Sequence, residues 1–149
     1  NIIQPDFIRV HATGIKLESK LGEFVRDGSF TLQSEEEIVI EQKLFLQQLH
    51  EMDSYYVNEH IVNLLLEVRG NLRTEKQEML STIDRFLTLP PDERLLFTVG
   101  RRLNIFFRLD DLKKPKLHQK AGESLQQILS KNPHVDFAAL CNYVRQSQI

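Results

Sequence analysis

Apolar residues recur at intervals of three and four along almost the whole chain, whereas strict alternation of apolar and polar residues is nearly absent. This period places apolar side chains along one face of an α-helix. Proline, glycine and small polar residues interrupt the pattern roughly every 20 residues, which matches helices of ordinary length. The sequence therefore predicts an all-α fold of about six to eight helices joined by short connections.

Local signals predict where these helices begin. Ser34 and Glu37 have the spacing of a capping box, in which a hydroxyl and a carboxylate satisfy backbone N–H groups of the first turn. Thr74 and Gln77 repeat that spacing, and Pro91 suits a first helical turn because its missing N–H has no partner there. The helix starts are predicted near Ser34, Ser54, Thr74, Pro91, Lys116 and Asp136.

Residues 1–33 carry the least certain pattern. A short helix is predicted over residues 5–14, and a second one is predicted to end at Gly28, because glycine readily adopts the left-handed conformation that closes a helix. Residues 29–33 are interpreted as a linker. Gly100 interrupts the apolar stripe of the helix that begins at Pro91, and we predict that it allows close packing against another helix, since glycine otherwise costs about 1 kcal/mol relative to alanine.

The spacing of the predicted helices also suggests an arrangement. Two successive helices span about 40 residues, which is the size of the helix pair in HEAT or armadillo repeats. Short connections make neighbouring helices antiparallel. We therefore expect antiparallel pairs in a HEAT/armadillo-like right-handed array, with a compact helical bundle as the alternative. Residues 1–149 are interpreted as a single helical domain of a larger protein.

Composition narrows the class of protein. A chain of 149 residues with 41% hydrophobic and 27% charged residues has the balance of a globular domain with one core. Its apolar runs are only a few residues long, whereas a membrane-spanning helix needs about 20. The single cysteine, Cys141, has no partner for an internal disulfide, which favours a reducing compartment. We expect an intracellular protein, cytoplasmic or nuclear, with Cys141 as a core residue.

The usual signs of catalysis and of cofactor binding are missing from the sequence. No two of the five histidines have the i, i+4 spacing of paired metal ligands on a helix. The six glycines are scattered and form no phosphate-binding loop. Acid–base catalysis needs carboxylates that converge in a cleft, and no pair in the sequence stands out. We therefore predict a protein that is not an enzyme and needs neither metal nor cofactor.

Charge is unevenly distributed although the formal net charge is only −2. Residues 35–67 contain eight acidic residues and one lysine, whereas residues 94–120 contain eight basic residues and two aspartates. The opposed charges are consistent with packing inside the domain, with stacking of copies or with a partner. The sequence leaves these three explanations open.

The basic segment is the candidate functional feature. If its cations project from one polar helix face, they form a positive edge that suits an acidic or phosphorylated segment of another protein. The leading hypothesis is thus a protein–protein interaction module, a scaffold or adaptor. The alternatives are binding of RNA or DNA through the same edge, and a solvated helix face without a partner. The predicted contact residues are Arg101, Arg102, Arg108, Lys113, Lys114 and Lys116.

Overall fold

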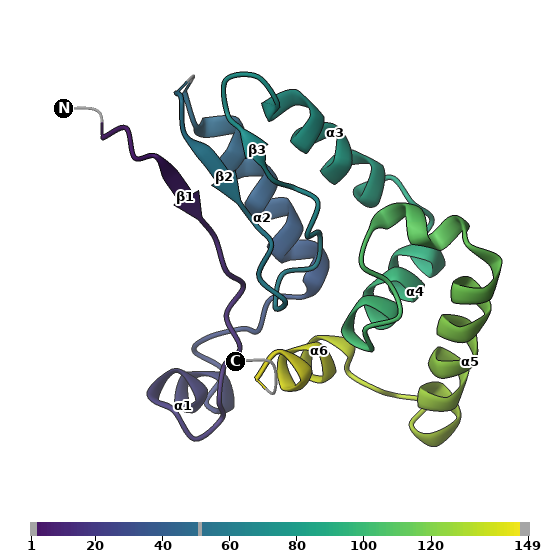
Figure 1. Cartoon of the computed structure of the whole chain (residues 1–149). Helices are drawn as coiled ribbons and strands as arrows, with labels where there is room; N and C mark the ends of the chain where they lie inside the picture. The colour runs from purple at the N-terminus through teal and green to yellow at the C-terminus, as the bar shows by residue number, and fades with distance from the viewer. Residues whose placement is uncertain (1–2, 51, 147–149) are drawn as a thin grey trace.

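The computed structural model describes residues 3–50 and 52–146. This part of the chain is mostly helical, with six α-helices, one 3-10 helix and three short strands (Figure 1). The predicted helical character is confirmed, but the fold is not purely α-helical, because a small sheet is present. In chain order the elements are β1 (Phe7–Arg9), α1 (Lys20–Arg26), α2 (Glu35–Gln48), β2 (Tyr55–Val57), β3 (Gly70–Asn71), α3 (Lys76–Leu87), α4 (Pro91–Arg102), the 3-10 helix η1 (Leu109–Lys113), α5 (Pro115–Lys131) and α6 (Phe137–Gln146).

The sheet has the strand order β1-β2-β3. β1 runs parallel to β2, with Ile8 opposite Tyr56, and β3 pairs with β2 in the antiparallel sense. The helix α2 packs against this sheet, because Gln42 donates to the Tyr56 hydroxyl at 3.1 Å and the ring of Phe45 lies 6.5 Å from that of Tyr56. β1 is the outer strand on the side away from β3 (Figure 1).

Most of the predicted helix starts are confirmed. Ser34 and Glu37 form the predicted capping box at the start of α2, and Pro91 occupies the first turn of α4. The Asp136 carboxylate accepts hydrogen bonds from the first backbone N–H groups of α6. Gly28 follows α1 with a φ of +79°, as expected for a left-handed residue.

The predicted capping box at Thr74 is wrong. The helix α3 begins at Lys76, and Glu75 precedes it without a side-chain cap. The Asn71 side-chain oxygen instead accepts the backbone N–H groups of Arg73 and Thr74, so these residues form a turn that leads into the helix.

The helix predicted to begin at Ser54 is replaced by β2, a buried loop and β3. The apolar residues of this stretch do not form one stripe; they are buried on several sides. Two buried asparagines bond the backbone of the loop, as Asn58 donates to Leu65 O at 2.7 Å and Asn63 donates to Asn58 O at 3.2 Å. Asparagine side chains compete with helical hydrogen bonds in this way, and the loop conformation results.

The helix predicted over residues 5–14 is also wrong. Residues 7–9 form a strand that pairs with residues 55–57, and the flanking residues also bond it, through Tyr55 N–H to Asp6 O at 2.8 Å and Val10 N–H to Val57 O at 3.1 Å. The partner strand lies about 50 positions further along the chain. The local apolar pattern therefore carried no information about this pairing.

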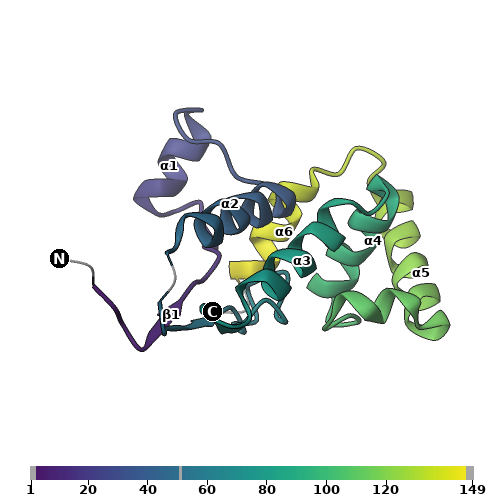
Figure 2. The same cartoon turned by 90° about the horizontal axis from the view of Figure 1, so that it is seen from above.

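The remaining helices pack around an aromatic core. Phe97 of α4 lies between Phe86 and Phe106, with ring centroids 5.8 and 5.9 Å away. A methyl group at Gly100 would meet the Phe106 ring at 2.4 Å and Ala121 of α5 at 3.2 Å, which confirms Gly100 as a packing glycine. Figure 2 shows α4 and α5 at the opposite end of the molecule from α1. No helix of the described residues is long and apolar enough to cross a membrane.

Candidate functional site

The predicted basic edge is divided by the fold. Arg101 and Arg102 are buried, with exposed fractions of 0% and 4%, so the expectation that they project into solvent is wrong. Both lie in the last turn of α4, whose end is enclosed by the loop between β2 and β3. Neither side chain is free to meet a partner from the surface.

These two arginines donate hydrogen bonds to backbone carbonyl groups of the buried loop that replaces the predicted helix. Arg101 donates to the backbone oxygens of Ile61 at 3.1 Å and Asn63 at 3.3 Å, and Arg102 donates to Val62 O at 2.9 Å. A buried loop without regular structure leaves carbonyl groups unpaired, and each unpaired group destabilises the fold. The arginines thus supply the donors that a helix would have found within itself.

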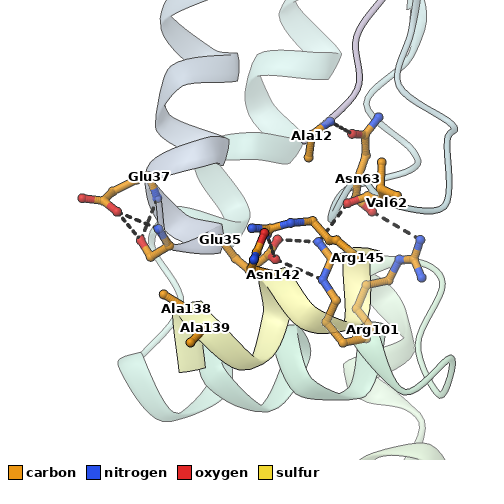
Figure 3. A network of polar contacts seen from close by, with 12 residues as sticks. Ala12, Glu35, Glu37, Val62, Asn63, Arg101, Ala138, Ala139, Asn142 and Arg145 are labelled. Atoms are coloured by element: carbon orange, nitrogen blue, oxygen red, sulfur yellow. Dashed lines mark hydrogen bonds and ion pairs between the residues drawn. The ribbon is translucent and has the colours of Figure 1, made fainter. Parts of the chain in front are cut away.

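Glu35, Arg101, Arg102 and Arg145 form a buried charged cluster, in which Glu35 pairs with two of the arginines. Its carboxylate is buried and accepts from Arg102 Nε at 3.1 Å and Arg102 Nη2 at 2.5 Å, and it also pairs with Arg145 of α6 (Figure 3). Glu35 is the first residue of α2, so its charge also meets the positive end of the helix dipole. The cluster therefore joins α2, α4 and α6 through one carboxylate.

The pKa of Arg101 is lowered to about 10, mainly by burial and secondly by the neighbouring charge of Arg102. The carboxylates of Glu67 and Glu35 act in the opposite direction. Cys141 lies close to this cluster and is buried, which confirms it as a core residue. Burial raises its thiol pKa to about 12, so the thiol stays protonated and unreactive at neutral pH.

The other predicted contact residues, Arg108, Lys113, Lys114 and Lys116, are exposed on η1, its flanks and the first turn of α5. Their charge is partly compensated, because Lys113 pairs with Asp110 at 2.8 Å and Lys114 pairs with Asp111 at 2.7 Å. Asp110 also accepts from Arg85 at 2.6 Å. The positive edge is therefore smaller than the sequence predicted.

The acidic and basic segments meet inside the domain. Besides the Glu35 cluster, Arg94 Nε lies 3.1 Å from the carboxylate of Glu36, which stands in the same turn of α2. Intramolecular packing thus accounts for part of the opposed charge, one of the three explanations that the sequence left open.

A half-open cleft of about 440 Å³ lies beside the sheet. Segment 10–15, which continues the chain from β1, lines one side, and α2 lines the other. Its lining is mainly apolar and includes Phe30 and Phe45, two residues that are about 40% exposed. Apolar side chains gathered around a cleft of this size are typical of a binding site.

Two buried asparagines hold the wall formed by segment 10–15. Asn63 accepts from Ala12 N–H at 2.7 Å and donates to Val10 O at 2.8 Å (Figure 3). Asn142 of α6 accepts from Ile15 N–H at 2.8 Å and donates to Ile15 O at 2.9 Å. Each amide thereby bonds the backbone as a neighbouring strand would.

We expect Asn142→Leu to loosen this wall while the core stays folded. Leucine has a similar size but loses both bonds to Ile15, each of which contributes about 1 kcal/mol. Hydrogen exchange at the Ile15 amide should accelerate about tenfold. Exchange at Val99, in the buried middle of α4, should stay unchanged. Equal acceleration at both amides would show that the bond serves the whole fold and not the wall.

The backbone of β1 and of the residues that directly follow it has a free edge, defined by Phe7, Arg9 and His11. Asp6 O and Val10 N–H bond β2, and the backbone groups of Val10 and Ala12 bond Asn63. Alternate residues of a strand direct their N–H and C=O groups to opposite sides, so the backbone groups of the free edge point away from the sheet. No other described element lies along that side of β1 (Figures 1 and 2).

Two histidines lie at the end of the free edge. The rings of His11 and His60 are 4.2 Å apart. The pKa of His11 is lowered, mainly by burial and then by the charges of His60 and Arg9. Just below pH 6.5 the unfolded chain therefore binds more protons than the folded state. The free energy of unfolding decreases slightly as the pH falls through that region.

Neither the cleft nor the free edge was predicted from the sequence. The apolar residues of the cleft come from segments that were interpreted as separate helices and a linker, and the free edge lies inside a predicted helix.

Among residues 3–50 and 52–146 no group of three or more His, Cys, Asp and Glu side chains is placed to hold a metal ion. Comparisons of the chain with protein-family models, curated proteins and solved structures found no match.

Proposed function

We propose that this domain is a protein-interaction module that binds an extended segment of another protein along the free edge of β1. The added segment would lie as a further strand beside β1 and place alternate side chains in the cleft. The free edge carries this proposal, because unpaired N–H and C=O groups on an outer strand are a template for strand addition.

The cleft supports a peptide as the occupant. Segment 10–13 belongs both to the wall of the cleft and to the chain that continues β1, so a strand on the free edge runs directly past the cleft. Backbone hydrogen bonds would supply affinity, and the apolar pockets would supply specificity for alternate side chains. A lipid or another small apolar molecule would leave the backbone groups of the free edge unused.

His11→Pro should abolish binding of such a peptide without unfolding the domain. Proline removes the N–H of His11, which points outward, and leaves the inward bonds of Val10 and Ala12 intact. His11→Ala is the matched control, since it removes the ring and keeps the N–H. Peptides selected from a random library on the wild-type domain should lose binding at least tenfold in His11→Pro and keep it within about threefold in His11→Ala.

Backbone amide NMR locates the contact independently. The amides of Arg9 and His11 should shift and become protected from exchange when the selected peptide binds. Equal binding of the proline variant, or shifts confined to other surfaces, would contradict strand addition. Selection of no peptide, with the domain associating only with itself, would assign the free edge to a second copy of the chain.

The exposed part of the basic edge supports a second, weaker hypothesis. Contact of Arg108, Lys113, Lys114 and Lys116 with an acidic or phosphorylated segment, or with RNA or DNA, stays a prediction. Phosphate contacts make affinity fall steeply with salt, so a gel shift at low salt tests the nucleic-acid reading. The predicted HEAT/armadillo-like arrangement and the intracellular location, cytoplasmic or nuclear, also stay predictions.

A further inference from the structure

The buried cluster around Glu35 contains more positive than negative charge. Arg101, Arg102 and Arg145 are all buried, and the carboxylates that act on them are Glu35 and Glu67. Three guanidinium groups against two carboxylates leave one positive charge. Buried charge without a counter-charge is costly, so such a site favours an anion.

Arg145 connects this cluster to the cleft. Its side chain is only 2% exposed, yet it contributes to the lining of the cleft together with Asn63. Its Nη1 is engaged by Glu35, whereas its buried Nε has no hydrogen-bond partner among the described residues. Buried polar groups in folded proteins nearly always have a partner, and an unpaired one calls for an explanation.

We infer that Arg145 receives a carboxylate of the bound peptide, from an aspartate, a glutamate or the chain terminus. This inference rests on the proposed function, in which a peptide occupies the cleft. A guanidinium pairs with a carboxylate through short, charge-assisted hydrogen bonds. One carboxylate also matches the one uncompensated positive charge, whereas a phosphate group would bring close to two negative charges.

The surroundings of Arg145 specify the rest of the peptide. Ile15, Val39 and Leu64 are buried or nearly buried apolar residues that line the same cleft. An acidic residue that reaches Arg145 would therefore be flanked by apolar side chains. The inferred partner segment is extended and apolar, and it carries one carboxylate.

The test changes the peptide, because Arg145 also pairs with Glu35 and its replacement would endanger the fold. Peptides selected from a random library on the wild-type domain are synthesised, and each carboxylate is replaced in turn by the amide: Glu by Gln, Asp by Asn and the terminus by a carboxamide. One of these changes should weaken binding at least tenfold, because a desolvated charge pair loses one partner. The NMR signal of Arg145 Nε–H should shift with the carboxylate peptide and stay in place with the amide.

The outcomes separate this inference from the proposed function. Peptides that bind along the free edge with no sensitivity to any amide replacement would overturn the carboxylate and leave strand addition intact. A phosphoserine version that binds more tightly than the acidic one would overturn the carboxylate in favour of a phosphorylated partner. Peptides that bind equally well to His11→Pro would contradict the proposed function itself.

Discussion

Glu35→Gln is expected to lower the free energy of unfolding by about 3–5 kcal/mol. Glutamine keeps the shape of the side chain but removes its charge, so Arg102 and Arg145 would remain buried without their shared counter-charge. Breaking a buried ion pair from one side is costly for this reason, whereas the intact pair need not add much stability. Urea unfolding followed by circular dichroism measures the difference.

Glu36→Gln is the matched control. It makes the same chemical change in the same turn of α2, but Glu36 is 44% exposed and pairs with Arg94 near solvent. Exposed pairs contribute about 0–1 kcal/mol. A loss in Glu35→Gln no larger than that in Glu36→Gln would show that water reaches the cluster and that its charges are not held in a buried network.

Gly100→Ala is expected to destabilise the fold by about 2 kcal/mol, although alanine is the better helix former. The added methyl group would lie 2.4 Å from the Phe106 ring, and this ring is stacked on Phe97 with 5.9 Å between centroids. Both rings are fully buried, so neither moves aside at low cost. Overpacking of this kind costs about 1–3 kcal/mol and outweighs the gain in helix propensity.

Gly122→Ala in α5 measures the gain in helix propensity without a steric clash. A methyl group there would meet no atom within 4 Å, so the substitution should stabilise the domain by about 0.5–1 kcal/mol. The two glycine variants should therefore shift the unfolding midpoint in urea in opposite directions. Stabilisation by both substitutions would show that α4 and the Phe106 ring can separate without cost.

Several helix boundaries could be predicted because their causes are local. The capping box of Ser34 and Glu37 lies within one turn, and Pro91 and Gly28 act through their own backbone conformations. Such interactions join residues that are adjacent in any context, so the sequence pattern and the structure agree. The same reasoning failed at Thr74, where the Asn71 side chain bonds the backbone instead.

The structure of the stretch from Ser54 to Gly70 could not be predicted from its local sequence pattern. Its apolar spacing fits a helix, but the segment is enclosed on several sides, and its carbonyl groups are bonded by arginines about 40 positions away. β1 likewise depends on a strand far along the chain. Periodicity records which residues avoid water and not which distant groups satisfy the backbone.

The candidate site likewise has features that follow from the local sequence and features that depend on the tertiary structure. The sequence by itself determined where the two helices that carry the basic segment begin, at Pro91 and next to Lys116, because caps and breakers act over a few residues. Only the tertiary structure decided that Arg101 and Arg102 are buried, since Arg102 meets Glu35 across 67 positions. The cleft and the free edge of β1 also arise only when α2, β2 and α6 assemble, because each contributes one wall or one hydrogen-bonding side chain.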